Sequence, residues 1–341
     1  MRQPLVVSYG MGVDSTAMLV GMSRLGIRPD LILFADTMAE KGETYAYLAT
    51  MNAWCDKVGF PRVQVVTYTV KDFKNWPPYF GLEENCLTNG TLPSEAFGFG
   101  SCSEKWKQQP QNRHTKEWAP AIECWARGGK VRKAIGYDAS PADEKRACAA
   151  KRTFKVNGDD PLYEYWYPLQ EWGWNRLRCI QEIAKEGLPV PLKSSCFMCP
   201  NMKKDEVLAL PREKLQRLVI LEARAKPRLE GHMTQAELDQ SFERKSKAWE
   251  EKAAKAKKEG KPEPARKPRR KIQGERGLIR GLWRAKMMTD FIREQGLLPG
   301  AEVDRLASSV PAELIRRNEA HAAGRKVESW GEFYARVGVG N

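Results

Sequence analysis

The sequence has few histidines and no long apolar run, and each absence excludes a class of protein. Its three histidines lie far apart in the chain, so neither a Ser-His nor a Cys-His catalytic arrangement is expected. No apolar run approaches the length of a membrane-spanning helix, and no signal peptide precedes the first predicted strand. We therefore expect a cytoplasmic protein without a membrane partner.

Cysteine is missing from the last part of the chain, since none follows Cys199. In the cytoplasm the eight cysteines are expected to stay reduced, so clustered ones indicate metal or redox chemistry rather than disulfides. Cys196 and Cys199 form a Cys-x-x-Cys pair, which can bind one ion or cluster. The cysteines that lie in helix-like stretches, and are predicted to be small buried side chains, are Cys55, Cys124, Cys148 and Cys179.

Apolar, β-branched runs alternate with helical patterns over the first 70 residues. Residues 4–10, 30–37 and 63–70 are predicted to be strands, and residues 14–25 and 42–59 are predicted to be helices. This alternation predicts an α/β fold in which helices cover both faces of a parallel sheet. Ligands of such sheets bind beyond the carboxyl ends of the strands.

The loop SYGMGVDST, residues 8–16, joins the first predicted strand to the first helix. Gly10 and Gly12 would let the backbone approach a ligand, and the N–H groups at the helix start can bind an anion. Ser8, Ser15 and Thr16 add hydroxyl donors. The loop is neither a Walker motif nor a dinucleotide fingerprint, because no Gly-Lys-Ser/Thr ends it and the glycine spacing differs. A tight turn without a ligand is the alternative.

This loop resembles the PP-loop of the N-type ATP pyrophosphatases, Ser-Gly-Gly-x-Asp-Ser, with Gly10 and Met11 replacing the serine and the first glycine. Asp14 and Ser15 match that motif. Further segments resemble, in the same order, motifs of the phosphoadenylylsulfate (PAPS) reductase family: LILFADTMAEKGETYAYL, SCSEKWKQQP, IGYDASPADEKRA (with Tyr137 in place of an arginine) and SSCFMCP. The resemblance covers roughly residues 1–215 and implies a HUP-type, adenine nucleotide alpha hydrolase-like fold.

The resemblance implies that the loop holds the β,γ-phosphates of ATP with Mg²⁺, so that pyrophosphate leaves when a nucleophile attacks the α-phosphate. Asp14 and Ser15 would be the catalytic residues. The residues that it assigns to nucleotide binding are Ser8, Gly10, Gly12, Asp14, Ser15, Thr16 and Asp36. Asp14 could equally be a helix N-cap, and Asp36 could equally be a turn residue.

Iron–sulfur members of the family carry adjacent cysteines where this chain has Cys102 followed by a serine. Cys86 could replace the missing ligand, which gives the set Cys86, Cys102, Cys196 and Cys199. Four thiolates suit a [4Fe-4S] cluster or a structural Zn²⁺, and the resemblance favours the cluster; no metal is the third alternative. PAPS reductases use a nucleophilic cysteine near the C-terminus, so its absence here disfavours sulfonucleotide reduction.

The formal net charge of +14 favours a polyanionic partner, and most of it is concentrated. Residues 243–271 hold 13 Lys and Arg against five Glu. We predict an exposed basic helix followed by a linker near 259–270, which either contacts nucleic acid or is simply solvated. Single bases upstream are either phosphate contacts or plain surface: Lys105, Lys107, Arg113 and Lys133. The six aromatics of residues 163–176 either pack in the core or stack on bases.

These observations predict a PP-loop domain over residues 1–215 and a basic helical C-terminal extension over residues 216–341. The predicted function is cleavage of ATP to AMP and pyrophosphate, which activates a nucleic acid (DNA or tRNA) or a nucleotide, most readily for sulfur transfer. The alternatives are a sulfonucleotide reductase and a non-catalytic nucleotide-binding accessory that works with a protein partner in a nucleic-acid complex.

Overall fold

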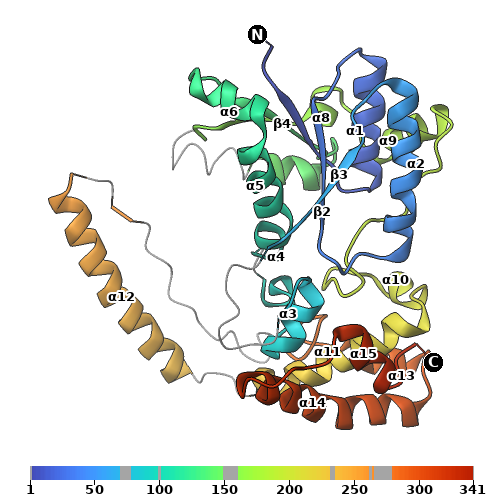
Figure 1. Ribbon diagram of the computed structural model, residues 1–341, viewed down its shortest axis with the longest axis vertical. Coiled ribbons are helices and arrows are strands. Elements are labelled where there is room, and N and C mark those ends of the chain that lie inside the picture. The colour runs from blue at the N-terminus through green and yellow to red at the C-terminus, as the bar shows by residue number, and fades with distance from the viewer. Residues whose placement is uncertain are drawn as a thin grey trace.

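The computed structural model describes residues 2–69, 78–98, 101–148, 160–230, 235–260, 263–264 and 279–340. In these ranges five strands form one all-parallel sheet in the order β3-β2-β1-β4-β5 (Figure 1). The strands are β1 (Leu5–Ser8), β2 (Leu31–Asp36), β3 (Val63–Thr67), β4 (Val131–Ile135) and β5 (Tyr163–Trp166). The chain reverses its direction across the sheet between β1 and β4, which makes the end of β1 a topological switch point where ligands bind. The predicted α/β fold with a parallel sheet is confirmed.

Helices cover both faces of the sheet (Figure 1). One face carries α1 (Val13–Arg24), α2 (Gly42–Val58), α8 (Pro168–Glu171) and α9 (Arg176–Lys185), whose apolar residues share a core with β1 and β2. The other face carries α5 (Gln109–Glu117) and α6 (Ala119–Ala126), and Ala121 packs there against Val6 and Leu33. Apolar side chains alternate along β1 and therefore supply both layers.

A second group of helices packs below the carboxyl end of the sheet (Figure 1). Its members are α3 (Leu82–Asn89), α10 (Lys204–Leu208), α11 (Arg212–Glu230), α13 (Met288–Glu294), α14 (Gly300–Ala322) and α15 (Trp330–Arg336). One hydrophobic cluster joins α3 to Phe197, to α11 and to the C-terminal helices, and so runs across residue 215. Within it the buried Glu222 accepts the backbone N–H groups of Leu282, Met288 and Thr289, which ties residues 282–289 to α11.

The basic segment begins within α12 (Gln235–Lys258), which stands apart from the sheet and from the other helices in Figure 1. From residue 242 onward the described side chains of α12 are mostly exposed, as predicted for residues 243–258. Trp249 Nε1 donates to the carbonyl oxygen of Pro264 at 2.7 Å. Most of the linker predicted near 259–270 lies outside the described residues. None of the helices in the described ranges combines the length and the apolar character needed to span a bilayer.

Candidate functional site

A cavity of about 710 Å³ lies at the carboxyl end of the sheet, over the switch point between β1 and β4. Of the nucleotide-binding residues assigned by the resemblance, those that line it are Ser8, Gly10, Gly12, Asp14 and Ser15. Thr16 and Asp36 are not among its lining residues. The side chain of Thr16 is buried and shares a 3.1 Å hydrogen bond with the hydroxyl of Tyr9. Asp36 instead closes a turn, since its carboxylate accepts the backbone N–H of Met38 at 2.7 Å.

The loop is closed by hydrogen bonds of its own serine. Ser15 Oγ accepts the backbone N–H of Gly10 and donates to the carbonyl oxygen of Gly12, both at 3.2 Å. Gly12 is the N-cap of α1, so the first N–H groups of α1 face the cavity region rather than the core. A Cβ on Gly12 would lie 2.7 Å from Ser194 Oγ, and one on Gly136 would lie 2.9 Å from the Cα of Ser15. Glycine is thus required at residue 136, where a Cβ would meet backbone atoms, whereas a side chain at residue 12 would displace only the Ser194 hydroxyl.

Met11 occupies the position of the first glycine of the PP-loop motif. Its φ of 54° lies in the left-handed region, which an L-residue with a long side chain adopts at a cost of about 1–2 kcal/mol. Its side chain is 1% exposed and packs in the core with α1 and α2. The loop therefore keeps the backbone shape that a glycine would allow, and burial of the methionine side chain offsets the strain.

Asp14 lies in the first turn of α1 and is not its N-cap. Its Oδ2 accepts from Arg176 Nη1 at 2.7 Å, whereas its Oδ1 is buried with no hydrogen-bond partner. Burial raises the pKa of Asp14, and the nearby Arg176 guanidinium opposes that rise. A buried oxygen without a partner suits a ligand of Mg²⁺, so the residues present fit the implied ion.

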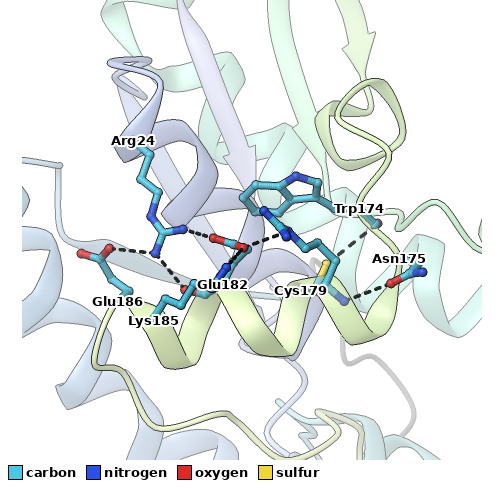
Figure 2. Close-up of polar contacts among 8 residues, drawn as sticks. Arg24, Trp174, Asn175, Cys179, Glu182, Lys185 and Glu186 are labelled. Carbon is cyan, nitrogen blue, oxygen red and sulfur yellow. Dashed lines mark hydrogen bonds and ion pairs between the residues drawn. The ribbon is translucent and has the colours of Figure 1, made fainter.

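Helix α9, which carries Arg176, is fixed on α1 by a second set of ion pairs at its other end (Figure 2). The side chain of Glu182 is 2% exposed and pairs with Arg24 of α1. It also pairs with Arg178 at 2.8 Å and with Lys185 at 2.9 Å. The two helices are therefore joined at both ends, and the position of Arg176 beside the loop depends on that packing.

Five cationic side chains line the cavity: Lys107, Lys133, Arg146, Arg176 and Lys193. Asp14 is the only carboxylate among the residues that line it in the described part of the chain. A concave site with this balance favours anionic ligands. Two of the four single bases considered from the sequence, Lys107 and Lys133, thus line the cavity. The other two do not: Lys105 lies among the rings of Tyr68, Tyr79 and Trp106. Arg113 is paired with Glu117 on the surface.

Aromatic rings form another part of the cavity wall. Tyr137, Tyr165 and Tyr167 line it, and the rings of Tyr137 and Tyr167 are stacked with an interplanar angle of 4° and centroids 5.6 Å apart. Trp166 instead is buried in the core. Core packing is therefore confirmed for Trp166, whereas base stacking by Tyr165 and Tyr167 stays a prediction.

The four cysteines predicted to bind a metal lie in one neighbourhood below the cavity. The thiols of Cys102 and Cys196 are close enough to Cys86 to act on its pKa, and Cys199 is coupled in the same way to Cys102. Burial raises the pKa values of Cys86, Cys196 and Cys199. Among the described residues no group of three or more His, Cys, Asp or Glu side chains has an arrangement that could hold a metal ion as it stands.

The other cysteines follow the prediction with one exception. Cys55, Cys124 and Cys179 are buried, as expected for small apolar side chains. Cys148 is exposed, so its predicted burial is wrong. Cys148 comes directly after the buried Ala147 in a helical stretch. Neighbouring residues of a helix point in different directions, so Cys148 faces the solvent although Ala147 faces the core.

A buried carboxylate links the cysteine group to the cavity. Glu40 is 2% exposed, and its Oε1 lies 3.1 Å from Lys107 Nζ and 3.6 Å from Cys196 Sγ. Thr37 Oγ1 also donates to that oxygen, at 3.1 Å. Desolvation alone would lower the pKa of Lys107, but the charges of Glu40 and Cys196 raise it. Lys107 lines the cavity, so one ion pair connects the cavity to the thiols.

Several residues of the site carry no local signal in the sequence. Arg176 and Lys193 are far from the loop along the chain, and Glu40 lies in a polar stretch between a strand and a helix. The structure adds one signal that the sequence lacks. Lys107 lies in the π-helical turn Glu104–Gln108, and such turns are frequent at functional sites. No protein-family model matches this chain, and no curated protein matches it either.

Proposed function

We propose that this protein binds ATP in the cavity at residues 8–15 and cleaves it to AMP and pyrophosphate, thereby activating a nucleic-acid or nucleotide substrate, most readily for sulfur transfer. The observation that carries the proposal is the convergence of Ser8, Gly10, Gly12, Asp14 and Ser15 on one cation-lined cavity at the switch point of a parallel sheet. A HUP-type fold is part of this proposal.

The cavity offers the groups that departure of pyrophosphate requires. Charge on the phosphates would be neutralised by the N-terminus of α1 and by cations such as Arg176 and Lys193, with Ser15 as a hydroxyl donor. Mg²⁺ would bind at Asp14 Oδ1, the buried oxygen without a partner. The stacked pair Tyr137 and Tyr167 offers a flat apolar face for a base.

A cysteine-bound metal centre belongs to the same proposal. Its ligands would be Cys86, Cys102, Cys196 and Cys199, since thiolates are ligands of both [4Fe-4S] clusters and Zn²⁺, and their side chains would have to move closer together to hold either one. If Cys86 does not bind, a cluster held by the other three thiolates would leave one iron open for sulfide or substrate. A metal binds only after the thiols have lost their protons. Burial of the Cys196 thiol opposes this loss, and the positive charge of Lys107 favours it.

The test is an ATP assay that separates the products, carried out on the full chain purified without oxygen. We expect AMP and pyrophosphate, slowly in the absence of the acceptor. A Ser15→Ala variant should lose most of this activity, whereas Ser308→Ala on the exposed side of α14 should retain it. ADP and phosphate as the products would refute the assignment.

A non-catalytic role in nucleotide binding is the second candidate, and the pairing of Asp14 with Arg176 favours it. The ion pair occupies one carboxylate oxygen that a metal could otherwise use. ATP binding at micromolar concentration without any AMP release, with DNA and with tRNA present, would favour this role over catalysis.

A further inference from the structure

Four of the five cations that line the cavity are balanced by a carboxylate of the protein. The pairs are Lys107 with Glu40 at 3.1 Å, Arg146 with Asp143 at 3.0 Å, Arg176 with Asp14 at 2.7 Å and Lys193 with Glu206 at 2.8 Å. Lys133 makes no ion pair with any residue that the structure describes. It is also the most buried of the five, with 4% of the residue exposed.

Lys133 is the middle residue of β4 and faces the α5–α6 layer. It is opposite Val6 of β1 in the strand register, and Val6 shares an apolar cluster with Ala121 of α6. Its Nζ donates to Asn112 Oδ1 at 2.7 Å and lies 5.4 Å from the ring centroid of Tyr163. One hydrogen bond uses one of the three ammonium protons.

The described groups around Lys133 stabilise its charge only from a distance. Asp160 acts on it at longer range, and the carboxylate of Asp160 accepts from the Tyr165 hydroxyl at 3.0 Å and from the backbone N–H of Leu162 at 2.9 Å. Burial of an ammonium without a paired carboxylate is costly, and such costs persist mainly at functional sites. A ligand anion in the cavity would remove this cost.

The wall beside Lys133 is neutral and rich in hydrogen-bonding groups. Gln108, Gln111 and Asn112 line the cavity from the turn and helix that cover this face, and Ser8 Oγ at the end of β1 bonds to Gln111 Oε1 at 2.7 Å. Carboxamides can donate to oxyanion oxygens without adding charge. The loop at residues 10–15 instead opens α1, which covers the opposite face of the sheet.

We propose that Lys133 binds a second anionic group in this cavity, a phosphate or sulfate of the acceptor substrate, while the loop at residues 10–15 holds the phosphates of ATP. The identity of the first ligand rests on the proposed function, whereas the anion subsite rests on the geometry of Lys133 itself. The acceptor is therefore an oxyanion-bearing molecule, either a small ion or a nucleotide phosphate, rather than a neutral one.

The experiment compares the wild-type chain with Lys133→Met, Lys133→Arg and the control Lys130→Met, three residues earlier and partly exposed. Binding of inorganic phosphate is measured by calorimetry and by the shift in melting temperature, and a 5′-phosphorylated dinucleotide is tested in parallel. Affinity for α,β-methylene ATP is measured on the same samples. Phosphate binding alone points to a small oxyanion as the acceptor, and dinucleotide binding points to a nucleic-acid phosphate.

We expect Lys133→Met to weaken phosphate binding at least tenfold, to change the affinity for the ATP analogue less than threefold, and to melt at a higher temperature than wild type without ligand. Lys133→Arg should retain most phosphate affinity, and Lys130→Met should behave as wild type.

Equal phosphate binding by wild type and Lys133→Met, or no binding by wild type, would overturn the subsite. An equal loss of phosphate and ATP-analogue affinity would place Lys133 in the ATP site and refute a second subsite. A lower melting temperature for Lys133→Met with unchanged phosphate binding would show a structural role instead. None of these outcomes depends on turnover, so loss of the ATP-cleaving activity leaves the test intact.

Discussion

At the scale of single residues, the two glycines of the loop differ in what they require. Gly12 has Ser194 Oγ 2.7 Å from the position of a Cβ, so a side chain there would force that hydroxyl to rotate away. Gly10 has only Ser15 Oγ nearby, at 3.8 Å, and its φ is not positive. A serine, as in the PP-loop motif, therefore fits at residue 10 without rearrangement, whereas at residue 12 the Ser194 side chain must move.

We expect Gly10→Ser to increase the affinity for ATP by about threefold to tenfold, because a hydrogen bond to a charged phosphate contributes about 1 kcal/mol or more. Equilibrium titration with ATP measures the change. The control is Gly42→Ser, where a Cβ meets no atom within 4 Å. Unchanged or weaker binding by Gly10→Ser would mean that residue 10 does not face the phosphates.

Lys133 should make stability depend on pH in a defined window. Burial lowers its pKa from 10.5 to about 8. Between these values the unfolded chain binds more protons than the folded chain, so the free energy of unfolding rises with pH. Lys133→Met should therefore be more stable than wild type at pH 7, and this advantage should shrink as the pH rises from about 8 to 10.5. Urea unfolding of both proteins across that range measures it; a constant difference would contradict the lowered pKa.

At the scale of elements, function depends on contacts between segments that are distant in sequence. The junction of α1 and α9 places Arg176 against Asp14 at one end and Glu182 against Arg24 at the other. The cysteine group joins α3, the short helix α4 (Ser101–Ser103) and the Cys-x-x-Cys segment. Both arrangements are held by buried side chains that have polar partners on a neighbouring element.

We expect Glu182→Gln to lower the free energy of unfolding by about 2 kcal/mol, because three cations would face a neutral amide at a buried position. Their partial exposure keeps the loss below that of a fully buried pair. Glu117→Gln removes an exposed pair with Arg113 and should change stability by less than about 1 kcal/mol. Chemical denaturation of both variants provides the comparison, and equal effects would argue against a structural role for the α1–α9 junction.

The cysteine group should bind metal in protein purified without oxygen, with about four irons per chain if all four thiolates are ligands. Cys196→Ser should lose the bound metal and should also melt at a lower temperature. Cys148→Ser, which changes an exposed thiol, should retain both. Elemental analysis identifies the metal. Stoichiometric zinc without iron would mean that the site binds Zn²⁺ rather than a cluster, and a metal-free wild type would mean that the cysteines form no metal site.

At the scale of the whole molecule, a compact body carries a basic helix that stands apart from it (Figure 1). Along α12 the charges alternate at four-residue intervals, as in Lys247, Glu251, Lys255 and Glu259, and Lys255 Nζ lies 3.9 Å from Glu259 Oε1. This pattern is typical of a solvated helix and leaves excess positive charge towards its C-terminal end. A nucleic-acid contact through this segment remains our proposal.

Deletion of residues 243–271 should reduce the salt dependence of nucleic-acid binding and leave ATP binding unchanged, because none of the described residues of that segment lines the cavity. If about six of its cations contact phosphates, wild-type affinity should fall roughly a thousandfold between 50 and 200 mM salt, since each contact releases counterions. Filter binding to duplex DNA, single-stranded DNA and tRNA at both salt concentrations tests this. Equally weak binding by the wild type and the deletion variant would leave the segment as a solvated arm or a site for an acidic protein.

The sequence by itself determined the alternation of strands and helices, the parallel sheet and the loop that enters its switch point, because these follow from local periodicity and from glycine positions. It also indicated that Cys86, Cys102, Cys196 and Cys199 form one group, through the resemblance to a known family. Only the tertiary structure decided that Arg176 pairs with Asp14, that Glu40 lies between Lys107 and Cys196, and that Lys133 is buried without an ion pair to any described residue. The physical reason is that burial and ion pairing depend on contacts between segments that lie far apart along the chain, and a local pattern of residue types carries no record of them.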